Sequence, residues 1–125
     1  MTDQETIDRS AAHLLKQGGR SIDRNGNCRY RGDNGEMCAI GCLIPDEDYS
    51  LGMEGRSVLS LMEIQSDFSR HSDCSKTMKR IGLTNESLLS DIQQVHDMNG
   101  PMLWVRKLIE VSEKHGLLNP YRGAV

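Results

Sequence analysis

Cysteine and histidine side chains are the residues of this chain with the clearest capacity for chemistry. Cys38 and Cys42 lie four residues apart, and His71 and Cys74 lie three apart, so each pair could project from one helical face. Together they would form a tetrahedral Cys3His set suited to zinc, and Cys28 could take the place of Cys74. Neither pair has the compact spacing of a zinc knuckle, and Cys38 and Cys42 belong to an apolar run where buried thiols are common. The sequence therefore predicts reduced, metal-free cysteines, with a zinc-stabilised module as an alternative.

Catalytic residues are not predicted. A nucleophilic cysteine needs a base that activates its thiolate, and none of the four histidines shares a local signature with a cysteine. The acidic residues 46–48 lack the spaced ligands of a calcium loop, and the chain contains neither a P-loop nor a dinucleotide-binding glycine motif. We therefore expect a protein that is not an enzyme and that carries no cofactor.

Charged side chains divide into a basic segment followed by an acidic one. Residues 20–31 carry four arginines against one aspartate, and residues 32–55 carry six acidic residues and neither Lys nor Arg. The net charge of −3 gives no indication of general affinity for nucleic acid. Mixed charge around a tyrosine instead favours a contact surface for another protein. The predicted members of this surface are Arg29, Tyr30, Arg31, Asp33, Asp46, Glu47, Asp48 and Tyr49.

The same residues leave a second interpretation open. The arginines could bind the phosphate groups of a nucleotide while Tyr30 or Tyr49 stacks on its base. The protein would then sequester a small ligand. If the surface binds a protein instead, we expect reversal of the charges of Arg29 and Arg31 together to abolish binding and to leave the fold intact.

A β-hairpin is predicted for residues 28–38. Residues 28–31 alternate small or aromatic residues with arginine, residues 32–35 are four turn formers, and residues 36–38 can return as a second strand. Cys28 and Tyr30 would share one face, leaving both arginines on the other face and outside the core. The apolar run of residues 38–44 follows. We expect it to form a short helix that ends at Pro45, although a run of this length also fits a strand.

Amphipathic helices are expected on both sides of this segment. A capping box at residues 2–5 opens the first helix, a second spans residues 57–69, a third begins after Thr84, and a fourth opens at Pro101 and ends near Gly116. Residues 71–77 are expected to form a loop, and Trp104 should be buried on the apolar face of the fourth helix. The predicted fold is therefore α+β, with about four helices packed around a small antiparallel hairpin. It forms one domain of residues 1–125, in which residues 117–125 are a tail.

Part of the chain resembles a known protein family. The matching positions are Tyr30, Arg31, Gly32, Cys38 to Glu47, Tyr49 and Met53 to Gly55, and the central motif is Cys-Ala-Ile-Gly-Cys-Leu-Ile-Pro-Asp-Glu-x-Tyr. This pattern resembles a family of small uncharacterised proteins carried by tailed bacteriophages and prophages. The resemblance implies a phage origin and the bacterial cytoplasm, and it brings no established activity, cofactor or catalytic residue.

The expected location and role follow from these observations together. The first residues contain no apolar signal region, and the chain has no apolar stretch long enough to span a membrane, so we expect a cytoplasmic protein. With catalytic motifs missing, the resemblance favours a phage accessory protein that binds a bacterial host protein and inhibits or modulates it. A host defence system is the most concrete target, and the sequence leaves a homodimer open.

Overall fold

The computed structural model describes residues 1–62 and 71–123. Within these ranges the chain forms helices and short 3-10 turns. The α-helices are α1 (Asp3–Gln17), α2 (Val58–Met62), α3 (His71–Arg80), α4 (Glu86–Met98) and α5 (Trp104–Lys114). The 3-10 turns are η1 (Gly41–Leu43), η2 (Asp46–Asp48), η3 (Leu51–Met53) and η4 (Pro101–Leu103).

The predicted α+β fold is wrong, because the described residues form helices and no strand. Where a hairpin was expected over residues 28–38, Arg31 and Met37 form one isolated antiparallel bridge, and Cys28 forms another with Ile22, which precedes the segment. The predicted turn does form, and its Gly32 amide donates to the carbonyl of Glu36. The amide of Tyr30, which would extend the ladder toward Cys38, donates instead to the side chain of Glu54, and the outward-facing amide of Arg31 donates to the same carboxylate. A side-chain carboxylate thus takes the place of a neighbouring strand.

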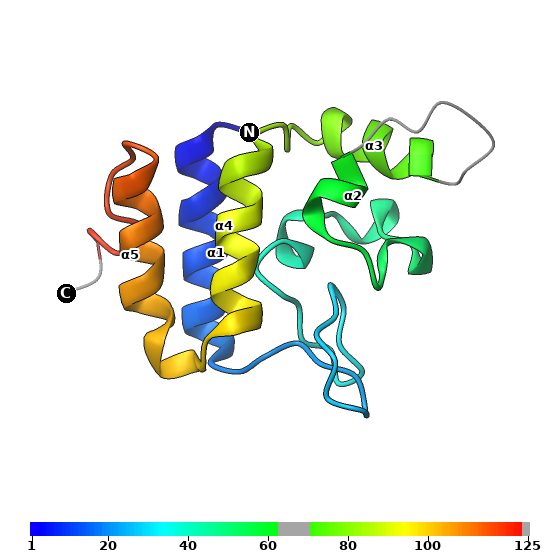
Figure 1. Ribbon diagram of the computed structural model, residues 1–125, viewed down its shortest axis with the longest axis horizontal. Helices are drawn as coiled ribbons and strands as arrows, with labels where there is room; N and C mark the ends of the chain where they lie inside the picture. The colour runs from blue at the N-terminus through cyan, green and yellow to red at the C-terminus, as the bar shows by residue number, and fades with distance from the viewer. Residues whose placement is uncertain (63–70, 124–125) are drawn as a thin grey trace.

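Helices α1, α4 and α5 lie side by side and form one half of the molecule (Figure 1). Helix α5 returns antiparallel to the other two, after the short connection that contains η4. The facing sides are apolar and include Ile7, Leu14, Ile92 and Leu108, all nearly inaccessible to solvent. Trp104 joins this core, as predicted, with an exposed fraction of 3%.

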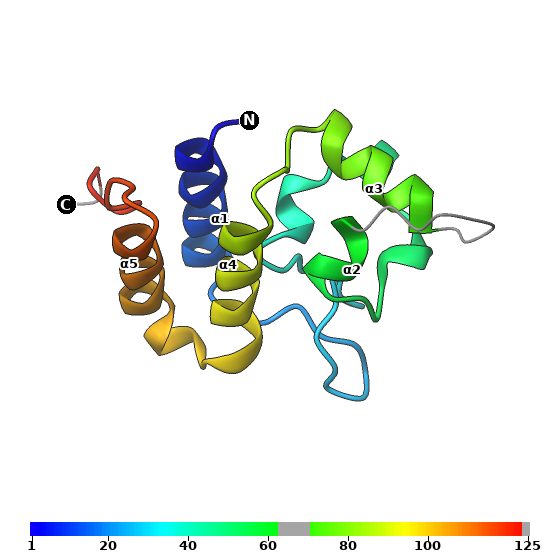
Figure 2. The ribbon, with the colours of Figure 1, turned by 45° about the horizontal axis from the view of Figure 1, so that its top comes forward.

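Helices α2 and α3 and the long segment between α1 and α2 form the other half (Figure 2). The apolar run contributes one 3-10 turn, η1, and a hydrogen bond from the Cys42 amide to the Cys38 carbonyl, so it is helical in type but shorter than expected. Gly41 lies against the neighbouring loop, since a Cβ atom placed there would be 2.0 Å from the carbonyl oxygen of Tyr30. The Ser10 hydroxyl of α1 donates to the carbonyl of Ala39 and joins the run to the three-helix half.

The helix boundaries follow the expected capping residues with small differences. Thr2 forms the predicted capping box, and Gly18 ends α1 in the left-handed conformation. Asn85 caps α4 one residue later than expected, because its side chain accepts the amide of Leu88. Pro101 opens η4, and α5 begins at Trp104. Of the predicted helix over 57–69, α2 covers Val58–Met62, and residues 63–69 lie outside the described part.

Residues 71–77 form the first part of α3, so the predicted loop is wrong. Cys74, Ser75 and Met78 are buried on one side of this helix. These few buried positions lie among polar residues, so the sequence shows no clear helical pattern of apolar residues. At the other end of the chain, residues 117–122 lie along α1, where Leu118 donates to Gln4 and Arg122 pairs with Asp8. None of the helices in residues 1–62 and 71–123 combines the length and the apolarity needed to cross a bilayer.

Candidate functional site: the Glu54 junction

The side chain of Glu54 joins two loops that are distant in sequence. Its Oε1 accepts the amide of Tyr30 at 2.9 Å, and its Oε2 accepts the amide of Arg31 at 3.0 Å and the hydroxyl of Tyr49 at 2.6 Å. The Nε atom of Arg29 lies 3.6 Å from Oε2. We call the group Arg29, Arg31, Asp46, Tyr49 and Glu54 the Glu54 junction. Because the carboxylate is mostly buried and fully hydrogen-bonded, it fixes loop 28–37 against loop 46–54.

Arg31 adds a second connection between the same loops. Its guanidinium donates to the carboxylate of Asp46 and to the carbonyl of Ile44, and its Cζ atom lies 5.0 Å from the centroid of the Tyr49 ring. Such a cation–π contact adds to the attraction between the loops. The side chain of Arg31 is mostly covered, whereas that of Asp46 is 89% exposed.

Tyr49 is held as a neutral donor in this arrangement. Partial burial raises the pKa of its phenol, and the hydrogen bond to Glu54 raises it further. The phenol therefore keeps its proton at neutral pH and donates it to the carboxylate. Beside it, Asp48 forms an ion pair with Arg80 of α3, so η2 is fixed to α3 as well as to the preceding loop.

The structure brings the eight predicted contact residues to one region, but with different exposure. Asp33, Asp46 and Glu47 are exposed, and most of the others are partly covered. Tyr30 is buried, and its hydroxyl donates to the carbonyl of Arg56. The sequence analysis missed Glu54 and Arg80 as members of the site. Glu54 does belong to the resembling motif at Met53 to Gly55, which is the signal that could have indicated it.

The side chains of Arg29 and Arg31 are not free on an outer face, as the hairpin pattern predicted, but are paired with neighbouring groups. Arg29 lies 3.5 Å from Asp33 and 3.6 Å from Glu54, and Arg31 is engaged by Asp46 and Ile44. Replacing both with glutamate would place two carboxylates beside the buried Glu54. That double change is therefore expected to disturb the two loops as well as any binding.

The geometry does not favour nucleotide binding. A buried Tyr30 cannot stack on a base, and a phosphate would have to displace the carboxylates that already contact Arg29 and Arg31. A polar cavity of about 300 Å³ lies beside the junction and includes Glu54, Gln93 and Asp97 in its wall. Arg29 and Arg56 line the same cavity, so its wall carries both signs of charge and gives no net attraction for a polyanion.

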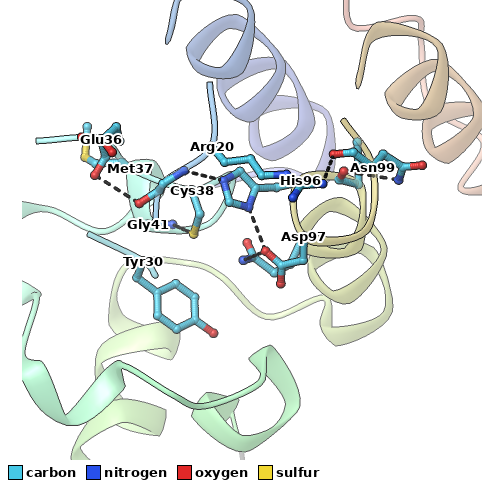
Figure 3. Close-up of polar contacts among 12 residues, drawn as sticks. Arg20, Tyr30, Glu36, Met37, Cys38, Gly41, His96, Asp97 and Asn99 are labelled. Carbon is cyan, nitrogen blue, oxygen red and sulfur yellow. Dashed lines mark hydrogen bonds and ion pairs between the residues drawn. The ribbon is translucent and has the colours of Figure 1, made fainter. Parts of the chain in front are cut away.

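A second cluster of reactive side chains includes Cys28 and Asp97 of the cavity wall and the neighbouring His96, and Figure 3 shows His96 beside Asp97. Cys28, His96 and Asp97 bring their potential ligand atoms within 4.8 Å of one another. The ring of His96 is fully buried, with Nε2 3.0 Å from the amide nitrogen of Ser21 and Nδ1 2.8 Å from Oδ1 of Asp97. Because a backbone amide can only donate, Nε2 must accept and Nδ1 must carry the proton that goes to Asp97.

This tautomer makes the cluster a poor metal site. A cation bound at Nδ1 would require removal of the Nδ1 proton, while Nε2 still faces the Ser21 amide. The ring would have to become an imidazolate, or the Ser21 hydrogen bond would have to break. Nor is Cys28 activated as a nucleophile, because burial and then the neighbouring Asp97 raise the pKa of its thiol. His96 instead stacks on Trp104, with ring centroids 5.5 Å apart, and joins the Ser21 loop to α4 and α5.

The alternative zinc set, Cys38, Cys42, His71 and Cys74, is not brought together by the side chains that the structure describes. Cys38 Sγ accepts the Gly41 amide, and the Cys42 thiol donates to the carbonyl of Ala39. Burial raises the pKa of Cys38 to about 12 and that of Cys42 to about 11, which opposes the thiolate form that zinc requires. All four cysteines are free thiols. The side chain of His71 lies outside the part of the chain that the structure describes.

Known proteins were compared with the chain at the level of both sequence and fold. Comparison with models of protein families, with curated proteins and with solved structures finds no match to this chain. The function must therefore be argued from the residues and their geometry.

Proposed function

We propose that this chain is a phage accessory protein that binds a bacterial host protein through the face built on the Glu54 junction. The observation that carries the proposal is the buried Glu54 carboxylate, which fixes two loops and thereby holds Asp46, Glu47 and Tyr49 in one orientation. A contact face that is already ordered loses little conformational entropy on binding. The resemblance to phage proteins supports the origin of the chain and of its target.

The charge on this face indicates the kind of partner. Asp33, Asp46 and Glu47 are exposed, whereas the guanidinium groups beneath them are already paired. The face therefore presents negative charge around the partly exposed ring of Tyr49. A complementary host surface would carry Lys or Arg beside an apolar contact for the tyrosine. Inhibition or modulation of a host defence protein through such a contact is the most specific form of the proposal.

The test uses Glu47, an exposed carboxylate outside the hydrogen bonds of the Glu54 junction, whose charge acts on Arg80 of α3. Wild-type protein, Glu47→Lys and Glu113→Lys are used as bait in bacterial lysate, and captured proteins are identified by mass spectrometry. Glu113 is an exposed acid on α5, so its substitution makes the same change in net charge at a distant position. We expect one host protein to be captured by wild type and Glu113→Lys and to be lost with Glu47→Lys. Equal capture by all three proteins would show that this face is not the contact, and release of a nucleotide from the purified protein would favour ligand sequestration.

A further inference from the structure

Exposed apolar side chains gather at the end of the three-helix half where α1 ends and α5 begins. Met102 is 93% exposed and Met98 is 76% exposed, although both are large apolar residues. Leu15 lies in the last turn of α1, Leu103 ends η4 and Val105 lies in the first turn of α5, and all three are exposed. We call these five residues the α1–α5 corner. Contiguous exposed apolar groups of this kind mark interaction sites, and methionine adapts readily to different partners.

A shallow groove of about 250 Å³ lies within this corner. Leu14 and Leu15 of α1 form one wall, Met102, Trp104 and Val105 form another, and Tyr121 contributes from the C-terminal segment. The volume lies below the roughly 300–1,000 Å³ of typical small-ligand sites. It therefore suits apolar anchor side chains from a partner better than a small molecule.

The corner is electropositive in a chain whose net charge is −3. Lys16 lies in the last turn of α1, and Arg106 and Lys107 lie in the first turn of α5, whereas Asp97 directly precedes Met98 at the end of α4. Glu110 also reaches this end, at 3.7 Å from Arg106 and 3.5 Å from Lys107. The start of α5 has no side-chain cap and no acid in its first turn, so the helix dipole adds to the positive charge.

We infer that the α1–α5 corner binds an acidic amphipathic helix of a partner protein. Such a helix places apolar residues three and four positions apart into a groove, and its flanking Asp or Glu side chains would meet Lys16 and Arg106. This contact is distinct from the Glu54 junction in residues and in charge, and it does not depend on the function proposed above.

Two other occupants fit less well. In a symmetric dimer through this corner, each surface would meet its own copy, and the cations of one chain would face those of the other. An anionic membrane is usually bound by clusters of roughly four to eight cations beside a protruding apolar face. At the corner the apolar residues instead line a groove, which suits inserted side chains.

The test uses Trp104, the one tryptophan of the chain, as a fluorescent reporter in the wall of the groove. The probes are a synthetic amphipathic helical peptide with leucine on one face and glutamate along its flanks, and a twin with lysine in place of every glutamate. We expect the glutamate peptide to shift Trp104 emission and to bind at least about tenfold more tightly than the twin, a difference of about 1.4 kcal/mol. Lys16→Glu combined with Arg106→Glu should reverse this preference.

Matched variants separate this inference from general charge effects and from the proposed function. Arg24→Glu combined with Lys76→Glu makes the same charge change at exposed positions elsewhere, and should preserve the preference. Met102→Ala should weaken binding, whereas Leu51→Ala, another exposed apolar position, and Glu47→Lys should not. Equal binding of both peptides, no binding, or a preference unchanged by the Lys16 and Arg106 reversal would overturn the inference. So would a dimer in sedimentation that Met102→Ala dissociates, or selective binding to phosphatidylserine vesicles over the peptide.

Discussion

Glu54 accepts the amide hydrogen of Tyr30 at 2.9 Å, although the two residues are 24 positions apart in the chain. The same carboxylate accepts the amide of Arg31, so two consecutive backbone donors are satisfied by one side chain. Consecutive amides of a strand point to opposite sides, so pairing with residues 36–38 could engage the Tyr30 amide but not the Arg31 amide. The relationship explains both why residues 28–38 remain loops and why those loops are held in place.

Glu54→Gln should therefore destabilise the fold. Glutamine has one acceptor oxygen and one NH2 donor group. Its NH2 group must therefore face either the Tyr30 amide, or the Arg31 amide and the Tyr49 hydroxyl, all of which are donors. We expect the free energy of unfolding to fall by about 1–3 kcal/mol, measured by urea denaturation. Glu47→Gln, on the exposed side of the same region, should change it by less than about 0.5 kcal/mol. Equal stability of the two variants would show that the Glu54 hydrogen bonds do not support the fold.

Gly41→Ala tests the close contact between the apolar run and loop 28–37. The added Cβ would lie 2.0 Å from the carbonyl oxygen of Tyr30, which is too close for any real contact. We expect a loss of about 1–3 kcal/mol or more in stability, measured by thermal and chemical denaturation. Gly52→Ala provides the control, since its Cβ would meet nothing nearer than the Ser50 hydroxyl at 3.7 Å. A Gly41→Ala variant as stable as Gly52→Ala would contradict this packing.

The cysteines should differ in their rates of alkylation. With pKa values of about 12 and about 11, Cys38 and Cys42 carry almost no thiolate at pH values near 8. Cys28 is partly exposed but also has a raised pKa, so it should react faster than the buried Cys38 and more slowly than an unfolded cysteine. Mass spectrometry of peptides after iodoacetamide treatment measures the order. Reaction of Cys28 faster than in urea-unfolded protein would indicate an activated thiolate and restore a catalytic interpretation.

The ion pair between Asp8 and Arg122 should contribute to stability in a pH-dependent way. The hydrogen bond from Arg122 lowers the pKa of Asp8, so the contribution is present above the unfolded-state value of about 3.9 and is lost as pH falls through the folded-state value. Both side chains are substantially exposed, which limits the effect to about 1 kcal/mol or less. Arg122→Ala should therefore reduce stability at pH 6 and match wild type at the most acidic pH that permits folding. A stability difference between wild type and Arg122→Ala that grows toward acidic pH would contradict this prediction.

Local signals predicted the ends of the elements better than the partners of the loops. The capping box at Thr2 and the left-handed Gly116 are set by neighbouring residues, and the sequence indicated both. No local sequence pattern indicates that the amides of Tyr30 and Arg31 donate to the Glu54 side chain, because the interacting groups are more than twenty residues apart. Helix α3 was missed because its buried stripe is short and is surrounded by polar residues.

The candidate site was predicted in part for the same reason. Charge pattern located Arg31, Asp46 and Tyr49 in one region, and the structure places them in contact. The burial of Tyr30 and the role of His96 could not be derived, since the amide of Ser21 lies 75 residues from the imidazole that accepts it. Long-range hydrogen bonds decided which polar residues are available to a partner.

Hydrogen–deuterium exchange on the complex with the captured host protein tests the central claim most directly. The claim is that the face held by Glu54 is the contact surface. The account predicts that the amides of residues 46–50 exchange more slowly in the complex than in the unbound protein, whereas those of residues 106–114 on α5 are unchanged. Slower exchange elsewhere in the chain, with residues 46–50 unaffected, would contradict it.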